Sequence, residues 1–268
     1  MADTPATTER HSPTDSLIRF ENVHKRFGSL VVLNGISIDF SVGQTAVVLG
    51  PSGTGKSVLL KHIVGLLSPD SGQVFFRDTR IDNLTERQLE PIRKRIGFLF
   101  QLSALFDSMT VGENISFPLR EHGILSRSEI RDRVAERLAM VGMENSEKKM
   151  PGELSGGQRK RVALARAIAL NPDVVLYDEP TTGLDPIRSD VINELILKLH
   201  EELKVSAIVV THDMASAFKV GDRLIMLMGG SIIADCDPDG LRAHPDPRVQ
   251  RFIAGRADEE DLRALHRL

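Results

Sequence analysis

The sequence predicts an α/β protein with a parallel β-sheet, an antiparallel β portion and an inserted α-helical segment. Short apolar runs followed by helical patterns occur at residues 45–67 and again at residues 173–213. Such alternation is typical of parallel strands joined by right-handed crossovers. Apolar positions at or near alternate spacing in residues 16–23, 35–40 and 72–81 indicate short antiparallel strands instead.

The composition is that of an ordinary globular chain and gives no sign of a nucleic-acid partner. The 268 residues are 41% hydrophobic and 26% charged, which provides enough apolar material for a sizeable core. The net charge is −3, whereas proteins that bind nucleic acid commonly carry a strongly basic surface. Two local basic clusters, residues 93–95 and 159–161, are therefore expected to be solvated helix faces or anion contacts.

The two ends of the chain differ in character from the region between them. Residues 1–16 are polar, lack the apolar core of a signal peptide and are predicted to form a disordered leader. Residues 17–254 are predicted to form one domain, and residues 255–268 a charged tail. No apolar run approaches the roughly 18 residues that a membrane-spanning helix needs. The single cysteine, Cys236, fits a reducing compartment, so we expect a cytoplasmic location.

The middle of the domain, about residues 102–170, is predicted to be a helical subdomain. Ser126 followed by Glu129 is the pattern of a capping box at the start of a helix. Gly142 is a typical C-terminal stop for that helix. Its apolar side chains recur at spacings of four, four and three residues, which places Ile130, Val134, Leu138 and Val141 on one stripe.

The last third of the chain returns to alternating strands and helices. An amphipathic helix is predicted at residues 187–203, between two buried strands. A hairpin is predicted at residues 222–235, turning at the two glycines 229–230. Two short helical pieces are predicted at residues 245–255 and 257–268.

The stretch GPSGTGKS at residues 50–57 matches the phosphate-binding pattern G-x-x-x-x-G-K-[ST] in full. An apolar strand pattern precedes it and a helical pattern follows it, as this kind of loop requires. Backbone N–H groups at the positive end of a helix bind phosphate there, and glycines let the backbone approach closely. Lys56 is expected to reach the β- and γ-phosphates of ATP, and Ser57 to bind Mg²⁺. The predicted binding loop comprises Gly50, Pro51, Ser52, Gly53, Thr54, Gly55, Lys56 and Ser57.

Two acidic residues, Asp178 and Glu179, follow the apolar run VVLY. Ligands of open α/β sheets bind at the carboxyl ends of the strands, so both acids are placed at a ligand site. Asp178 is predicted to be the carboxylate on the Mg²⁺ side of the site. Glu179 leaves the strand in a different direction, and we expect it to orient and deprotonate an attacking water. The alternative, a pair of acids that only caps a helix, would leave the lysine loop without a metal partner.

Three further side chains are candidates for the same site. His212 ends the apolar run VVT, and Gln101 ends the run FLF. At the sheet edge that carries the two acids, His212 is expected to contact the γ-phosphate, and Gln101 to coordinate Mg²⁺ or position water. Phe27, which precedes a glycine, is a candidate for stacking on adenine. Each residue also has a purely structural interpretation as a hydrogen-bonded histidine, a surface glutamine or a strand aromatic.

The stretch LSGGQ at residues 154–158 is a second glycine-rich helix start, but no lysine follows its glycines in the manner of the first loop. Its S-x-x-Q pattern is a capping box, which predicts a helix over residues 156–170. Capping requires no glycine, and two glycines in a first turn cost up to about 0.8–1 kcal/mol each. A simple capped helix is the alternative, which the geometry alone does not exclude, but the two glycines favour an anion that approaches the bare N–H groups of this turn. The first loop already serves its own ATP, so we expect the γ-phosphate of an ATP held by a second copy, in a two-fold dimer. This shared site comprises Ser155, Gly156, Gly157 and Gln158.

The order of these motifs resembles that of ABC-type ATPases, over about residues 17–253. The phosphate-binding loop, the Gln101 loop, LSGGQ, YDEP, GLDP and a later histidine follow one another as in that family. The resemblance implies a RecA-like P-loop NTPase core, an antiparallel β subdomain and an inserted α-helical subdomain. It also implies roles for single residues: adenine stacking for Phe27, a link to the transmembrane partner for Gln101, the catalytic base for Glu179, a crossing to the other subunit for Asp185 and the switch histidine for His212.

Two longer stretches resemble the ATPase of Mla-type, MCE-associated phospholipid transporters. They are FQLSALFDSMTVGENISFPLREH and HPDPRVQRFIAG, and the resemblance weakens after Gly255. It implies phospholipid transport linked to the cell envelope. The implied partners are a second copy of the chain, transmembrane permease subunits and an MCE-domain lipid-binding subunit. The implied location is the cytoplasmic face of the inner membrane.

Other functions are open at this point. The ATPases of importers for amino acids or other small polar solutes have similar sequences around the same motifs. A non-transport ABC ATPase acting on DNA or ribosomes would usually carry coiled-coil insertions or two ATPase units, and this chain has neither pattern. A plain P-loop kinase is disfavoured because it would have no use for LSGGQ.

Overall fold

The fold is built around a six-stranded sheet that is parallel except at one edge. The computed structural model describes residues 16–123 and 125–257. The strand order is β10-β9-β3-β8-β7-β6, in which only β10 is antiparallel to its neighbour. This order confirms the predicted α/β fold with a parallel sheet. The strands are β3 (Thr45–Leu49), β6 (Ile96–Leu99), β7 (Val174–Asp178), β8 (Ser206–Thr211), β9 (Arg223–Met228) and β10 (Ser231–Cys236).

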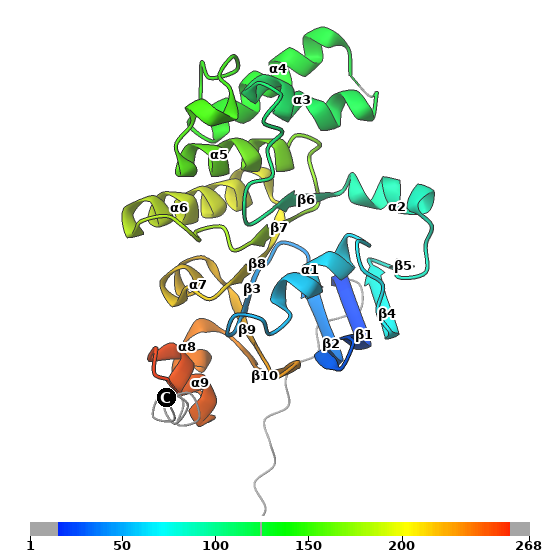
Figure 1. Cartoon of the computed structure of the whole chain (residues 1–268), viewed down its shortest axis with the longest axis vertical. Helices are drawn as coiled ribbons and strands as arrows, with labels where there is room; N and C mark the ends of the chain where they lie inside the picture. The colour runs from blue at the N-terminus through cyan, green and yellow to red at the C-terminus, as the bar shows by residue number, and fades with distance from the viewer. Residues whose placement is uncertain (1–15, 124, 258–268) are drawn as a thin grey trace, which may run out of the picture.

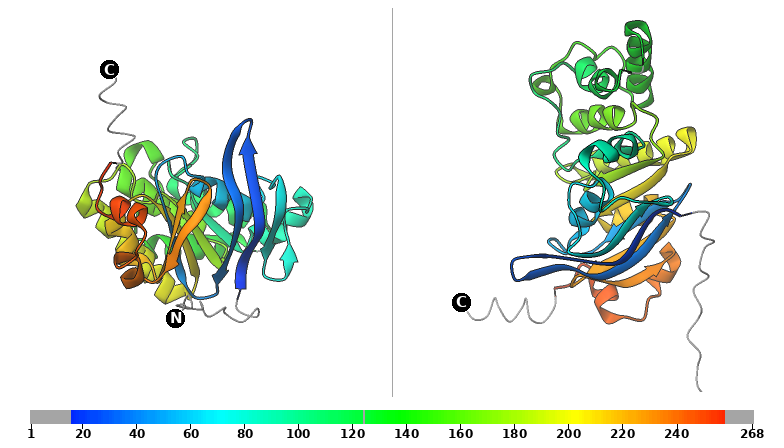
Figure 2. Two further views of the ribbon diagram at one scale, coloured as in Figure 1. Left: turned by 90° about the horizontal axis from the view of Figure 1, so that it is seen from below. Right: turned by 90° about the vertical axis from the view of Figure 1, so that its right-hand side faces the viewer.

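A four-stranded antiparallel sheet of order β2-β1-β4-β5 lies against the first sheet, as Figure 2 shows. It confirms the predicted antiparallel portion. Ser16 pairs with Ser41, so the first strand begins one residue inside the predicted leader, whose other residues lie outside the described part. The strands are β1 (Ser16–Phe27), β2 (Leu30–Ser41), β4 (Ser71–Phe76) and β5 (Thr79–Arg80).

The parallel sheet separates two hydrophobic cores. Successive side chains of a strand point to opposite faces, so each buried strand supplies both cores. In β3, Val47 and Leu49 pack with the helices α3 to α7, whereas Ala46 and Val48 pack with the antiparallel sheet and α1. The continuous apolar runs of the central strands are therefore explained by burial on two sides.

The helical subdomain consists of α3 (Val111–Glu121), α4 (Arg127–Met140) and α5 (Gly156–Ala167), which gather at one end of the molecule (Figure 1). The capping box predicted for α4 is present, and the helix ends just before Gly142 at a φ of 63°. The helix after LSGGQ is shorter than predicted, because it ends at Ala167 and not at residue 170. The N–H group of Ala169 donates only three residues back, which tightens and ends the last turn.

The other helices connect the strands. The predicted hairpin is confirmed, and its turn glycines have φ angles of 58° and 77°. The helices α2, α3, α7 and α8 were not predicted, and α1 stops before Gly65 rather than at residue 67. The helical piece predicted at residues 257–268 lies almost wholly outside the described residues. The remaining elements are α1 (Lys56–Ile63), α2 (Glu86–Arg93), the 3₁₀ turn η2 (Pro151–Glu153), α6 (Pro186–Leu203), α7 (Met214–Val220), α8 (Pro238–Arg242) and α9 (Pro247–Ile253).

The contact between β6 and α5 depends on Gly97. A Cβ atom at this position would lie 2.6 Å from the backbone oxygen of Ala167, which cannot move without disturbing the helix. We expect Gly97→Ala to destabilise the protein by about 1–3 kcal/mol and to lower the Tm by roughly 3–10 °C. Gly152→Ala is the control, because a Cβ there meets no atom within 4 Å. Equal Tm values for the two variants by calorimetry would contradict this account.

Candidate active site

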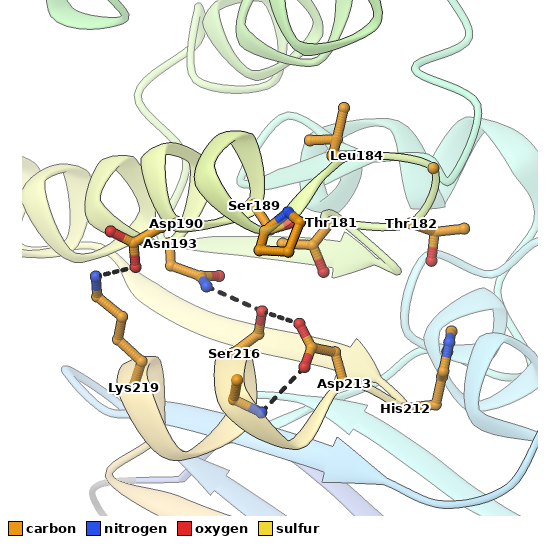
Figure 3. Close-up of a pocket in the computed structure, with 13 residues that line it drawn as sticks. Thr181, Thr182, Leu184, Ser189, Asp190, Asn193, His212, Asp213, Ser216 and Lys219 are labelled. Carbon is orange, nitrogen blue, oxygen red and sulfur yellow. Dashed lines mark hydrogen bonds and ion pairs between the residues drawn. The ribbon is translucent and has the colours of Figure 1, made fainter.

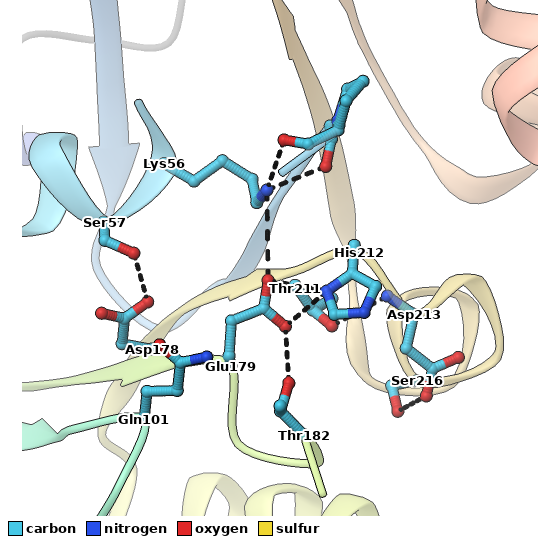
Figure 4. Close-up of polar contacts among 12 residues, drawn as sticks. Lys56, Ser57, Gln101, Asp178, Glu179, Thr182, Thr211, His212, Asp213 and Ser216 are labelled. Carbon is cyan, nitrogen blue, oxygen red and sulfur yellow. Dashed lines mark hydrogen bonds and ion pairs between the residues drawn. The ribbon is translucent and has the colours of Figure 1, made fainter. Parts of the chain in front are cut away.

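The parallel sheet brings the predicted site residues to one edge. Leu49 at the end of β3 pairs with Thr211 at the end of β8, and Asp178 at the end of β7 pairs with Val210. The loop of residues 50–57 and the acids therefore leave neighbouring strands at the same level. His212 follows β8 directly and enters the same space, as Figure 4 shows.

The phosphate-binding loop is shaped by glycine and closed by Lys56. Gly50 has a φ of 150°, and a Cβ atom there would lie 2.1 Å from the backbone oxygen of Leu227. The Lys56 Nζ atom donates to the backbone oxygens of Gly50 at 2.8 Å and of Pro51 at 2.9 Å. Burial lowers the pKa of Lys56, and the nearby acids Glu179 and Asp178 oppose that shift. The ammonium group thus sits in the curve of the loop that a phosphate would occupy.

Ser57 and Asp178 form an oxygen-rich pair beside this loop. The Ser57 hydroxyl donates to the Asp178 Oδ1 atom at 2.7 Å. Burial raises the pKa of Asp178, the hydrogen bond from Ser57 lowers it, and the charge of Glu179 adds to the rise. A cation placed here would stabilise the ionised carboxylate.

Glu179 lies at the centre of the network in Figure 4. Its carboxylate accepts a hydrogen bond from the Thr182 hydroxyl at 3.1 Å and lies 2.9 Å from the His212 Nδ1 atom. The Lys56 Nζ atom is 4.0 Å from the Glu179 Oε1 atom. The backbone of Glu179 is left-handed, with a φ of 51°, and its N–H group donates to the backbone oxygen of Val210 at 2.9 Å. Strained conformations of this kind gather at active sites.

The prediction missed Thr182, and its treatment of residues 159–161 was wrong in part. Thr182 carried no pattern of its own, although it stands only three residues after Glu179. Residues 159–161 were expected to be a solvated helix face or an anion contact, but Lys160 in their centre is only 5% exposed. Its position three and four residues before the buried Ala163 and Leu164 places it on the buried side of α5, which was the available signal.

Three other predicted residues form no side-chain hydrogen bond with Glu179. Gln101 is exposed on the loop that follows β6. Phe27 ends β1 with 47% of its surface exposed, and the Lys25 Nζ atom lies 5.6 Å from the ring centre. Asp185 is the N-cap of α6, where it accepts a hydrogen bond from the N–H group of Arg188 at 3.0 Å.

The LSGGQ stretch forms the predicted helix start. The Ser155 Oγ atom accepts from the Gln158 N–H group at 3.3 Å, and the Ser155 N–H group donates to Gln158 Oε1 at 2.9 Å. Gly156 and Gly157 form the first turn of α5, whose N–H groups have no partners within a helix. Within residues 16–123 and 125–257, no hydrogen bond joins this turn to Lys56 or to the acids.

A groove of about 500 Å³ lies between α6 and α7, beside the bend that follows Glu179 (Figure 3). The Asn193 side chain donates to the Ser216 hydroxyl at 2.9 Å, and this hydroxyl donates to Asp213 at 2.6 Å. Lys219 forms ion pairs with Asp190 and Glu194 across the same seam. These contacts hold the helix that begins after Asp185 against the loop that carries His212.

A glycine loop with a buried lysine, a hydroxyl paired with a carboxylate, and a second carboxylate at the same strand end define a P-loop nucleoside triphosphatase. The family model described as ABC transporter matches residues 33–182, more than half of the chain. The chain belongs to the ABC transporter family, and it binds and hydrolyses ATP.

Two groups of relatives have similar sequences. The intermembrane phospholipid transport system ATP-binding protein MlaF of Escherichia coli strain K12 is 39% identical over 243 residues, which is 91% of this chain and 90% of MlaF. The probable ribonucleotide transport ATP-binding protein Mkl of Mycobacterium leprae is 41% identical over 244 residues, 91% of this chain and 70% of Mkl.

Solved structures of related cassettes share the fold. The dimeric bacterial ABC transporter cassette MJ0796 superposes with a TM-score of 0.76 at 36% identity, covering 82% of this chain and 98% of that chain. CbiO1 from Clostridium perfringens, part of the CbiONQ transporter complex, gives a TM-score of 0.79 at 30% identity, covering 95% of this chain and all of CbiO1. These likenesses confirm the predicted P-loop NTPase fold.

The Thr182 hydroxyl holds one oxygen of the Glu179 carboxylate, so its loss should slow hydrolysis. We expect Thr182→Val, which keeps the shape of the side chain, to lower kcat about tenfold, as the loss of a hydrogen bond to a charged group predicts. Steady-state ATPase assays measure the effect. Thr181→Val is the matched control and should stay within about twofold of the wild type. If both variants hydrolyse ATP equally fast, the orientation of Glu179 does not depend on Thr182.

Proposed function

We propose that the chain is the ATP-hydrolysing subunit of a phospholipid transporter of the cell envelope, and that it works as a dimer with ATP between the two copies. The observation that supports the catalytic part best is the position of Glu179, held by His212 and Thr182 beside the phosphate-binding loop. The observation that supports the lipid substrate is the match with MlaF over 91% of this chain and 90% of MlaF.

Phosphate binding falls to Lys56 and the backbone of its loop. In the structure the ammonium group of Lys56 is bound to the loop's own carbonyl oxygens, and it exchanges these for the β- and γ-phosphate oxygens of ATP. The N–H groups at the start of α1 face the same space, because the loop leads directly into the helix. Phe27, whose ring is half exposed, stacks on the adenine.

The residues beside the loop fit Mg²⁺. Mg²⁺ prefers oxygen ligands and usually combines one or two protein groups with phosphate oxygens and water. The Ser57 hydroxyl and the Asp178 carboxylate are already in contact at 2.7 Å, and Gln101 supplies a third oxygen from the next strand end. The described residues contain no cluster of three or more His, Cys, Asp and Glu that could hold a metal ion by itself. Phosphate and water oxygens would therefore complete the Mg²⁺ coordination. The bound cation would neutralise charge on the phosphates.

Glu179 is the base in this mechanism. It accepts the proton of a water that attacks the γ-phosphorus in line, and the bond to the bridging oxygen of ADP breaks. His212 and Thr182 hold the carboxylate toward that water. When ATP is bound, His212 also contacts the γ-phosphate, which is the role of the switch histidine.

The second half of the site is the start of α5 in another copy. Ser155 and the two following glycines present first-turn N–H groups that suit an anion. Asp185, at the start of α6, crosses to the other copy at the same interface. ATP then joins the two copies, and hydrolysis separates them.

Paired variants test the shared site directly. We expect Ser155→Arg to bind ATP normally and Lys56→Ala to bind it poorly, and neither alone to hydrolyse it. Mixing them should restore one complete site per heterodimer, formed by Lys56 of one chain and Ser155 of the other. Single-turnover hydrolysis of ATP by the mixture measures this.

The control is each variant alone at the total protein concentration of the mixture. A mixture that stays as inactive as its components, or a Ser155→Arg variant with wild-type turnover, would contradict a site shared between chains.

The names of the relatives suggest two substrates, phospholipid and ribonucleotide. This chain covers 90% of MlaF but 70% of Mkl, so MlaF corresponds to it over nearly its whole length. The name of MlaF, together with its 39% identity over 91% of this chain, supports phospholipid. The amino-acid importer that the sequence left open is less well supported.

The proposed partners are permease subunits in the inner membrane and an MCE-domain lipid-binding subunit. None of the helices among the described residues has the length and apolarity needed to cross a bilayer. Leu102 is 90% exposed and Phe106 is 41% exposed on the loop that begins at Gln101. Exposed apolar side chains of this kind suit a protein partner. The permease binds this loop from the cytoplasmic face of the membrane.

Purification of the tagged chain from native membranes tests these partners. We expect a multispanning permease and an MCE-domain protein to co-purify. Leu102→Asp should reduce recovery of the permease at least fivefold, because a charge replaces an apolar contact, while ATP hydrolysis by the isolated chain stays unchanged.

Val42→Asp is the matched control. Val42 is 50% exposed, but it lies before the amino end of β3, whereas the Gln101 loop follows the carboxyl end of β6. Recovery of a ribonucleotide- or amino-acid-binding protein in place of the MCE protein would overturn the lipid assignment.

A further inference from the structure

Lys160 is a buried cation that has no part in the chemistry described so far. It belongs to α5, the helix that begins after Ser155. Its Nζ atom donates to the backbone oxygen of Gln101 at 3.2 Å and to the backbone oxygen of Glu179 at 3.3 Å. One ammonium group therefore joins the helical subdomain, the loop that follows β6 and the bend that carries the carboxylate.

The burial of this charge is unfavourable in itself. Within the described part of the chain, Lys160 has no carboxylate oxygen within 4.0 Å, and its partners are neutral carbonyl groups. Burial lowers the pKa of Lys160, and the charge of Glu179 only opposes that shift. An apolar side chain of the same length would fill this space without the loss of hydration. An apolar side chain would not form the two hydrogen bonds that Lys160 donates. The function of Lys160 is therefore sought in these two bonds.

The hydrogen bond to Glu179 acts on a strained residue. Glu179 has a left-handed backbone with a φ of 51°, which few residues other than glycine, asparagine and aspartate adopt. Its N–H group is fixed by the oxygen of Val210, and its carbonyl oxygen is fixed by Lys160. The direction of the Glu179 side chain follows from this backbone, so both contacts help to aim the carboxylate.

The same lysine is rigidly connected to Ser155. Lys160 stands five positions after Ser155, the N-cap of the same helix, which is roughly 7.5 Å along the axis. We propose that Lys160 is a positioning residue that sets Glu179 and Gln101 in register with α5, so that engagement of Ser155 by the ATP of the partner subunit is transmitted to the base. The inference rests on the proposed function, in which Glu179 is that base and the site is shared between two copies.

Lys160→Met tests the proposal in the full-length chain, because methionine keeps the length and removes the donors. We expect kcat for ATP hydrolysis to fall at least tenfold while KM and the Kd for ATP stay within about twofold, since Lys56 and its loop are untouched. Lys160→Gln, which keeps N–H donors, should retain several-fold more of kcat than Lys160→Met. A kcat for Lys160→Met within twofold of the wild type overturns the proposal. So does equal loss of kcat in the two variants, because packing alone would then explain it.

A double-mutant cycle with Ser155→Ala tests the transmission. If Lys160 relays the engagement of Ser155, Lys160→Met should cost much less once Ser155 has been replaced, and the losses will not multiply. Losses in kcat that multiply would show two independent sites and overturn the relay. Lys198→Met is the matched control: its Nζ atom also donates to a backbone oxygen, that of Met140 at 3.2 Å, but at an exposed site. It should keep the wild-type kcat.

Glu179→Gln separates failure of this inference from failure of the proposed function. If Glu179→Gln hydrolyses ATP at the wild-type rate, the assignment of the base is wrong and the proposed function fails with it. If Glu179→Gln is inactive while Lys160→Met is normal, the base stands and only the role of Lys160 is rejected.

Discussion

The parallel pairing of β3, β8 and β7 is the constraint on which the rest of the site depends. Their register fixes the ends of three strands at one level, so the phosphate-binding loop, His212 and Glu179 meet without long connections. Burial on both faces makes this arrangement rigid, because each strand fills two cores. The chain could move any one of these groups only by shifting a whole strand, which the packing opposes.

Charge balance is the second constraint. Two lysines and two carboxylates are buried near the carboxyl ends of the strands: Lys56, Lys160, Asp178 and Glu179. Ion pairs neutralise these charges only weakly. Lys56 and Glu179 are 4.0 Å apart, and Lys160 and Asp178 are held mainly by hydrogen bonds to neutral groups. Burial accordingly lowers the pKa of both lysines and raises that of Asp178. A bound nucleotide would compensate these buried charges: its phosphate groups would stabilise the charged lysines, and a divalent cation would stabilise the ionised Asp178.

Most of the fold and much of the site could be read from local sequence because each depends on a local rule. The loop of residues 50–57, the capping boxes at Ser126 and Ser155 and the glycine hairpin require particular residues at fixed spacing, and all are present as predicted. The hydrogen-bond partners of Lys160 and Thr182 could not be found in this way, because they lie on other elements or on a bend whose conformation no short pattern specifies. The early end of α5 likewise depends on the hydrogen bond that the Ala169 N–H group donates three residues back. The apolar pattern of the sequence continues beyond Ala167 and gives no sign of this end.

Glu179 stands between two lysines that come from different parts of the fold. Lys56 reaches it from α1, the helix of its own nucleotide loop, and Lys160 reaches its backbone from α5, the helix that faces the second copy in the proposed dimer. The carboxylate responds to the first through charge, and the bend that aims it is held by the second through a hydrogen bond. A base placed in this way is sensitive to both halves of a shared site. The left-handed backbone of Glu179 is consistent with such a role, since a strained bend held by several contacts changes direction when one of them moves.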